Sequence, residues 1–241
     1  MSDDQGERIT IPTAGGDMPA WQWTPSGGSG PGVLLLQEIF GVSRYIKRRG
    51  AALAAAGYVV VAPELYWRLD PGLPPLDESA PDVVDTAMGR AMALDWEQTV
   101  GDAATALDML RGRADGGRVG ILGFCFGGGL GFNVAAVSDP TCLVSYYGSA
   151  LPGLLHLAPQ VTAPSLHHFG LADDYIPADT VAAIREAVTA SNPGVVFETY
   201  EGANHAFDND DFFFHAPEAS RLAWERTLEF LGRQLSPAGA Q

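Results

Sequence analysis

The sequence predicts an α/β fold in which a mostly parallel central sheet is flanked by helices on both faces. Three features support this: short continuous apolar runs, helical segments between them, and glycine or proline where segments end. Such apolar runs are typical of strands buried in a parallel sheet, and their alternation with helices implies right-handed crossovers. The 241 residues, 46% hydrophobic and 18% charged, suffice for one such domain. We therefore expect a single domain over residues 1–241.

The first elements differ from the later ones. Residues 8–12 and 18–23 alternate apolar and polar side chains, which favours an antiparallel hairpin that with its following loop fills residues 1–30. Buried strands are then expected at residues 33–37, 58–62 and 119–123, and later strands at residues 143–147, 165–169 and 195–200. Helices are expected at residues 45–56, 96–111, 126–137, 178–190 and 216–235, with Gly57 and Gly112 closing the first two.

Residues 65–95 do not fit this alternation. The segment is rich in proline and acidic residues and is too long for a plain connection, so we expect an irregular excursion. It could act as a lid over a pocket, or it could only cover the edge of the sheet. The sequence leaves these two interpretations open.

A nucleophile motif, Gly123-Phe-Cys125-Phe-Gly127, lies between an expected strand and an expected helix. A nucleophile on so tight a turn has a strained backbone, and glycines two residues away leave room for the neighbouring elements. The helix N-terminus favours a thiolate, and the N–H of Phe126 can donate to an oxyanion. A buried structural cysteine and a dinucleotide-binding loop are the alternatives, but the G-x-G-x-x-G spacing is absent. We predict that Cys125 is the nucleophile of an α/β-hydrolase fold and that Cys142 is a core residue.

The base is expected after the nucleophile, because in this fold the acid and then the histidine follow it in sequence. His205 comes directly after the last expected strand, where it can take the thiol proton and later protonate a leaving group. His167 and His168 lie inside a strand, where a hydrogen-bonded histidine in the core or at the edge of the sheet is expected. His156 and His215 are too far from the end of any expected strand to fit as well as His205.

The acid is expected in the loop after the strand at residues 165–169. Two neighbouring aspartates occupy it, and either could hold the His205 imidazole in the right tautomer. The spacing Gly-x-x-Asp-x-x-Ile-Pro favours Asp173 over Asp174. Alternatively, both carboxylates cap the helix that begins near residue 178.

Charge and composition limit the partners and the compartment. The formal net charge of −15 disfavours nucleic acid and anionic membranes as partners, and no apolar stretch is long enough to span a bilayer. The acidic N-terminal residues resemble no signal peptide, and two cysteines make no disulfide framework, so we expect a cytoplasmic protein. We also expect a monomer. The acidic run at residues 208–211 lacks the full calcium-loop pattern, so we expect a solvated turn and no metal site there. Acyl transfer by a nucleophile, a base and an acid needs no cofactor, so none is expected.

Together these motifs resemble the dienelactone hydrolase family. The matching stretches are residues 37–41, 57–66, 123–128, 146–148, 170–177 and 202–207. The resemblance implies a triad of Cys125, His205 and Asp173. It also implies that Glu38 helps to create the thiolate, and that the N–H of Ile39 acts beside that of Phe126 in the oxyanion hole.

One departure from the family bears on the substrate. Members that cleave dienelactone carry arginines that hold the substrate carboxylate, but residues 70–89 contain no arginine and Asn209 stands at the second position. Arg68 and Arg90 are near in sequence without matching these positions. We therefore expect a small neutral ester or lactone to be cleaved through a thioester acyl-enzyme. The alternatives are a general carboxylesterase or thioesterase, a non-catalytic protein that binds a small ligand, and an oxidation-sensing Cys125.

Overall fold

The computed structural model describes residues 6–70, 72–78, 80 and 82–236. The chain forms two compact units, residues 1–119 and 120–241, and each is described by itself. Residues 1–5, which belong to the stretch that resembles no signal peptide, lie outside the described residues, as do Pro71 and Pro81 of the excursion. The single-domain organisation stays a prediction.

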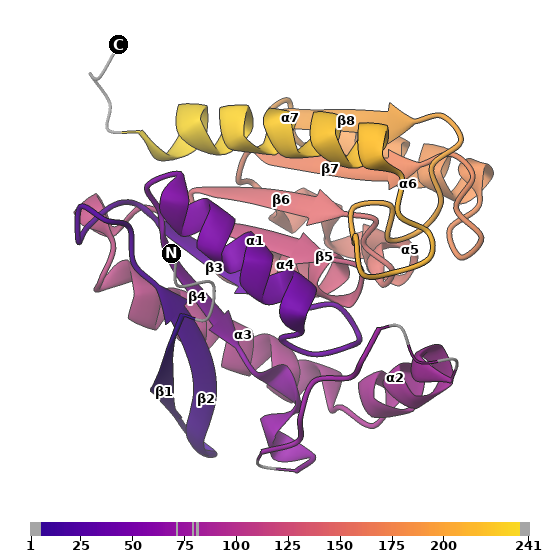
Figure 1. Ribbon diagram of the computed structural model, residues 1–241. Coiled ribbons are helices and arrows are strands. Elements are labelled where there is room, and N and C mark those ends of the chain that lie inside the picture. Colours follow the sequence, from indigo (N-terminus) through magenta and orange to yellow (C-terminus); the bar gives the residue numbers. More distant parts are fainter. Residues whose placement is uncertain (1–5, 71, 79, 81, 237–241) are drawn as a thin grey trace. The chain divides into compact units, whose positions relative to one another are not determined.

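The first unit contains four strands in the order β1-β2-β4-β3 (Figure 1). β1 (Glu7–Thr13) and β2 (Gly16–Trp23) form the expected antiparallel hairpin, and β2 also pairs antiparallel with β4 (Val59–Pro63). β4 pairs in parallel with β3 (Gly32–Leu36). Every residue of β3 and β4 is buried, so the apolar runs have the burial that the sequence predicts.

The helices of this unit begin with side-chain caps. The Ser43 hydroxyl accepts the Ile46 N–H at 3.5 Å at the start of α1 (Arg44–Ala55), and Gly57 follows the helix with the expected left-handed backbone, φ 100°. Asp95 accepts the N–H of Gln98 at 3.0 Å at the start of α3 (Trp96–Arg111). Two short 3-10 turns cover Leu65–Arg68 and Asp115–Gly117.

The expected irregular excursion at residues 65–95 is partly wrong, because it contains the helix α2 (Val83–Met92). Val83 and Ala87 are the buried residues of this helix, whereas Met88 and Met92 are exposed. Apolar side chains on the solvent side blur the helical period, and the preceding prolines hide the start of the helix.

The second unit contains four parallel strands in the order β5-β6-β7-β8. These strands are β5 (Val119–Phe124), β6 (Cys142–Tyr146), β7 (Ser165–Gly170) and β8 (Val195–Tyr200). The helices are α4 (Phe126–Val137), α5 (Leu151–Leu154), α6 (Ala178–Ser191) and α7 (Pro217–Leu235), with a 3-10 turn at Leu155–Gln160. The sequence did not predict α5 or this 3-10 turn.

Helices cover both faces of this sheet, as predicted. A Cβ on Gly128 of α4 would lie 2.8 Å from the Ser145 hydroxyl oxygen. The hydroxyl group of the next residue, Tyr146, is instead 2.7 Å from that of Thr227 on α7. Neighbouring side chains of a strand point to opposite faces, so α4 and α7 pack on opposite sides of β6.

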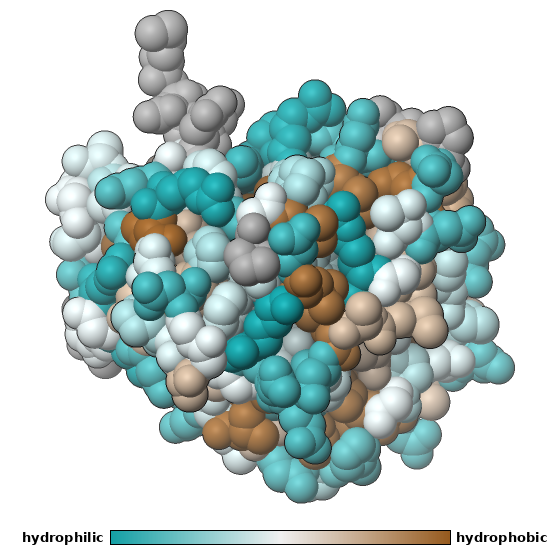
Figure 2. Space-filling view, turned by 90° about the horizontal axis from the view of Figure 1, so that it is seen from below, coloured by the Kyte–Doolittle hydropathy of each residue, from teal (hydrophilic) through white to brown (hydrophobic). Residues whose placement is uncertain are grey.

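The surface mixes hydrophilic and hydrophobic side chains over the face drawn in Figure 2. Among the residues that the structure describes, no helix combines the length and apolarity needed to cross a membrane.

Candidate active site

Cys125 lies at the turn between β5 and α4, in the order that the motif predicts. Its backbone has φ 52° and ψ −112°, a left-handed conformation that is strained for a residue with a side chain. A Cβ on Gly123 would collide with the carbonyl oxygen of Gly127, so the first motif glycine is needed for this close approach. The Cys125 N–H donates to the Tyr146 carbonyl at 3.0 Å, which ties the turn to β6. The thiol therefore lies at the carboxyl end of β5 and at the N-terminus of α4.

His205 lies in the loop that follows β8, and its side chain is 7% exposed. Its Nε2 atom is 3.1 Å from the Sγ atom of Cys125. Its Nδ1 atom is 2.8 Å from Oδ2 of Asp173, whose side chain is completely buried. The second oxygen of Asp173 accepts the N–H groups of Tyr175 at 2.8 Å and Ile176 at 2.9 Å. The structure thus brings a thiol, an imidazole and a carboxylate into one continuous line of contacts.

The electrostatics of His205 follow from this line. Burial by itself lowers the pKa of the imidazole, but the negative sulfur of Cys125 and the Asp173 carboxylate outweigh it and raise the pKa to about 10. An imidazolium between two negative groups is stabilised by both of them. The arrangement is therefore suited to a thiolate–imidazolium pair, the reactive form of a cysteine nucleophile.

Asp174 differs from its neighbour Asp173 in what it contacts. Its carboxylate accepts the side-chain N–H of Asn204 at 2.7 Å, and its backbone N–H donates to the Asn204 side-chain oxygen at 2.9 Å. Helix α6 follows Pro177 and has no side-chain cap, so capping by either aspartate is wrong. The sequence analysis also missed Asn204, although an amide directly before the histidine was a visible signal.

Two aromatic rings flank the imidazole, and both escaped the sequence analysis. Tyr147 is fully buried and its ring centroid is 5.1 Å from that of His205. The ring of Tyr175 meets His205 edge-on at 5.2 Å and is 55% exposed. One ring therefore contacts the imidazole from the core, and the other contacts it from the side of the solvent.

Two predicted residues, Glu38 and Ile39, belong to the first unit. Glu38 is 1% exposed, and its carbonyl accepts the Gly41 N–H at 3.2 Å. The Ile39 carbonyl accepts the Tyr66 hydroxyl at 2.7 Å. Phe126, the other expected oxyanion donor, is the first residue of α4. The roles of all three stay predictions.

The strand histidines are core residues, as expected. His167 and His168 are fully buried, and burial lowers the pKa of His167 to about 4 and that of His168 well below its usual value. His168 lies between the hydroxyl groups of Tyr200 at 2.8 Å and Thr227 at 3.1 Å. Cys142 is likewise fully buried, in β6.

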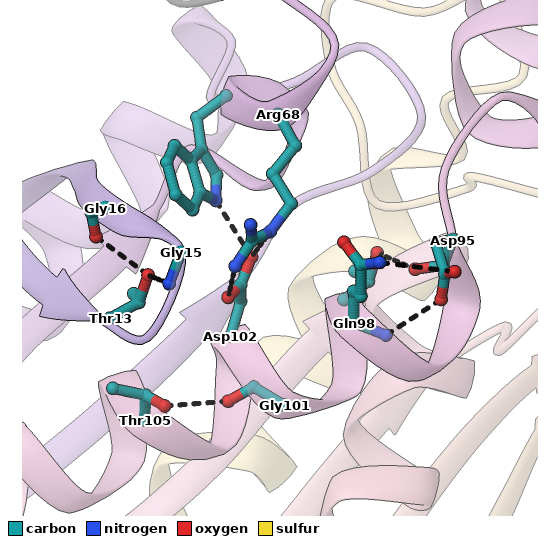
Figure 3. A network of polar contacts seen from close by, with 11 residues as sticks. Thr13, Gly15, Gly16, Arg68, Asp95, Gln98, Gly101, Asp102 and Thr105 are labelled. Atoms are coloured by element: carbon teal, nitrogen blue, oxygen red, sulfur yellow. Dashed lines mark hydrogen bonds and ion pairs between the residues drawn. The ribbon is translucent and has the colours of Figure 1, made fainter.

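Both arginines of the excursion, Arg68 and Arg90, have partners within the first unit. Arg68 binds both carboxylate oxygens of Asp102, at 2.8 and 2.7 Å, and the Trp67 indole donates to the same carboxylate at 2.9 Å (Figure 3). Arg90 donates to the Pro74 carbonyl at 2.8 Å. These guanidinium groups hold the local fold of the first unit.

The expected solvated turn at residues 208–211 is wrong for its first half. Asp208 and Asn209 are completely buried, and Asp208 accepts the Ser220 hydroxyl at 2.8 Å from α7. The acidic sequence gives no sign of this burial, because the Asp208 carboxylate is buried against a hydroxyl group twelve residues later in the chain. Within the described residues, no group of three or more His, Cys, Asp or Glu side chains is arranged to hold a metal ion.

Comparison with known proteins identifies the family. The sequence profile of the dienelactone hydrolase family matches residues 18–235. The chain belongs to this family. It is 37% identical over 229 residues to a carboxymethylenebutenolidase of Pseudomonas sp. strain P51, covering 93% of each chain. It is 32% identical to carboxymethylenebutenolidase 1 of Cupriavidus pinatubonensis, covering 93% of this chain and 95% of the relative.

A solved structure supports the same assignment for the fold. The putative dienelactone hydrolase of Klebsiella pneumoniae has a TM-score of 0.80 and 30% identity, covering 94% of this chain and 98% of that chain. This member of the dienelactone hydrolase family therefore has the α/β-hydrolase fold, as predicted, and is a hydrolase that acts on ester or lactone bonds.

Proposed function

We propose that this hydrolase cleaves a small ester or lactone through Cys125, with His205 as acid and base and Asp173 as the group that orients the imidazole. The observation that carries the proposal is the unbroken line from the Cys125 sulfur through His205 to the Asp173 carboxylate, with contacts of 3.1 and 2.8 Å. Both contacts are within the hydrogen-bond reach that proton transfer requires.

The reaction has two halves. In the first, the Cys125 thiolate attacks the carbonyl carbon, the His205 imidazolium protonates the departing alkoxide, and a thioester forms. In the second, neutral His205 takes a proton from water, the resulting hydroxide attacks the thioester, and the carboxylic acid leaves as the thiolate–imidazolium pair returns. Asp173 keeps the Nδ1–H in place during both halves. A helix-start N–H such as that of Phe126 suits the oxyanion, while the oxyanion role of Ile39 and the thiolate-forming role of Glu38 follow from the family resemblance alone.

The cysteine is tested with a paired substitution. Cys125→Ala is expected to abolish hydrolysis of p-nitrophenyl acetate, because the thioester cannot form. Cys142→Ala removes the other thiol, which lies in the core, and is expected to keep the activity. Wild-type protein quenched during turnover should carry an acyl group on Cys125 by mass spectrometry. Equal rates for Cys125→Ala and wild type would end the proposal.

For the substrate, we propose a neutral ester or lactone. The net charge of −15, the lack of arginine in residues 70–89 and Asn209 in place of a second arginine all disfavour a carboxylate-bearing substrate. Arg68 and Arg90 are both occupied, as described above.

A carboxylate-bearing lactone is the second candidate. It is favoured by the 37% identity to a protein named carboxymethylenebutenolidase. A panel of neutral and anionic lactones and esters separates the two, because a neutral substrate should give the larger kcat/KM. A higher kcat/KM for the anionic lactone than for every neutral substrate would overturn the neutral assignment while leaving Cys125 as nucleophile.

A further inference from the structure

The Asn204 side chain connects the two loops that carry His205 and Asp173. Its oxygen accepts two backbone N–H groups, that of Asp174 at 2.9 Å and that of His205 at 2.6 Å. Its amide nitrogen donates to the Asp174 carboxylate at 2.7 Å. The orientation of the amide is unambiguous, because a flipped group would set N–H against two N–H donors.

Both residues of this connection are direct sequence neighbours of a proposed catalytic residue. Asn204 directly precedes His205, and Asp174 directly follows Asp173, although the two loops are separated by 30 residues in sequence. The contact between His205 and Asp173 is a single hydrogen bond of 2.8 Å between the same two loops. Two of the Asn204 bonds, both to Asp174, cross between these loops. A backbone bond from the Ala172 N–H to the Ala203 carbonyl at 3.0 Å joins the loops nearer their bases. The Asn204 bonds therefore restrict the motion that remains at the loop tips, where His205 and Asp173 lie.

The bonds between Asn204 and Asp174 should affect the position of the two loops more than the stability of the fold. Asp174 is exposed and Asn204 is half-buried, so water competes for each of these bonds and their net contribution to folding is small. The reaction rate is much more sensitive to the loss of these bonds, because a displacement of about 1 Å at the reacting groups can cost about 100-fold in rate.

We propose that Asn204 is a positioning residue that, together with Asp174, holds the loop of the base against the loop of the acid. The proposal rests on the function proposed above. Only an amide meets its requirements at position 204, since one atom must accept two N–H groups while another donates to a carboxylate. Aspartate keeps the acceptor and lacks the donor, and it sets a second carboxylate against that of Asp174.

The proposal can be tested by exchanging the amide of Asn204 and the carboxylate of Asp174 between the two loops. Asn204→Asp is expected to lower kcat for p-nitrophenyl acetate about 100-fold at pH 8 with little change in KM. The double variant Asn204→Asp with Asp174→Asn places the donor on the other loop, and is expected to restore kcat to within about fivefold of wild type. Asp174→Asn alone is the reference for the double variant. Asp179→Asn, which removes the same charge at the exposed first turn of α6, should leave kcat unchanged.

The pH profile separates positioning from a general loss of structure. Facing carboxylates raise the pKa of one of the pair, and the protonated form can donate as the amide does. The ratio of Asn204→Asp to wild-type kcat should therefore rise as the pH falls from about 8 to about 5. Circular dichroism and Tm check that each variant is folded.

Two outcomes would overturn the positioning role while leaving the triad intact. In one, Asn204→Asp keeps kcat within about twofold of wild type at pH 8 although Cys125→Ala is inactive. In the other, the double variant is no faster than Asn204→Asp. Full activity of Cys125→Ala would instead remove the function on which the proposal rests.

Discussion

Two buried carboxylates, one in each unit, show how the same kind of site can serve two purposes. The side chains of Asp102 and Asp173 are 6% and 0% exposed, and each accepts three hydrogen bonds. Asp102 receives two from Arg68 and one from the Trp67 indole. Asp173 receives two from backbone N–H groups and one from the His205 imidazole.

The difference lies in whether the partner can give up its proton. The hydrogen bond that Arg68 donates to Asp102 raises the pKa of Arg68 above a value that is already very high, so the guanidinium keeps its charge at every physiological pH. His205 is a titratable partner, and its other nitrogen touches Cys125. A fixed charge pair can only hold structure, whereas a carboxylate behind an imidazole can support a proton transfer.

Among substitutions at the two carboxylates and their partners, Asp173→Asn is expected to have the largest effect. The backbone donors of Tyr175 and Ile176 can still bond an amide oxygen, so the loop should remain folded. The amide nitrogen would face Nδ1 of His205 and favour the wrong tautomer, so kcat should fall by about 10³–10⁴-fold. Steady-state hydrolysis of p-nitrophenyl acetate measures this loss, and a decrease of less than tenfold would remove the orienting role of Asp173.

The matched variant Asp102→Asn should lower the stability of the fold and leave the activity unchanged. It removes the charge opposite Arg68, and we expect the free energy of unfolding to fall by about 2–3 kcal/mol. The kcat should stay near that of wild type, because neither Arg68 nor Trp67 is assigned a role in the reaction. Urea denaturation and the same ester assay measure both quantities. An unchanged stability would mean that the Asp102 bonds contribute little to folding.

How much the sequence revealed depends on how local each feature is. The turn at Cys125 and the loop of His205 were predictable, because glycine spacing and strand ends are written in neighbouring residues. The contacts of Asn204 and the burial of Asp208 were not, since each depends on a partner brought near only by folding. For Asp208 the acidic sequence suggested an exposed turn, and for Asn204 the sequence suggested no contact at all.

Secondary structure shows the same limit. The fully apolar runs of β3 and β4 gave clear strands, with bounds that differ from the prediction by one residue. Helix α2 was missed because Val83 and Ala87 are its only buried residues and exposed methionines interrupt the pattern. Short apolar faces on helices are therefore the weakest signal in this chain.

The partners of the two carboxylates, His205 and Arg68, should also differ in how their protonation depends on pH. His205 has a pKa raised to about 10, against an ordinary value of 6.5, so its ring should stay protonated at pH 8 and lose its proton only as the pH rises through about 10. The stabilisation that folding gains from this protonation is fully present below pH 6.5 and is lost progressively as the pH rises from there to about 10. NMR of the imidazole measures the titration directly.

Cys125→Ala is the control for the cause of this shift. Removal of the negative sulfur leaves burial and Asp173 to oppose each other, so the pKa of His205 should fall towards neutral values. An imidazole that titrates identically in wild type and Cys125→Ala would contradict the thiolate–imidazolium pair. The stability lost in Asp102→Asn should meanwhile be the same at pH 7 and at pH 9.

The smallest effect is expected from Trp67→Phe, which removes one of the three bonds to Asp102. Arg68 would keep both of its bonds to the carboxylate, and its guanidinium, 4.3 Å from the Trp67 ring centroid, would keep an aromatic surface to stack on. The free energy of unfolding should fall by about 1 kcal/mol, the usual contribution of one hydrogen bond. In combination with Asp102→Asn the further loss should be smaller, because the indole would already lack its charged acceptor. Fully additive losses in urea denaturation would show that Trp67 acts through packing and that the three bonds do not form one network.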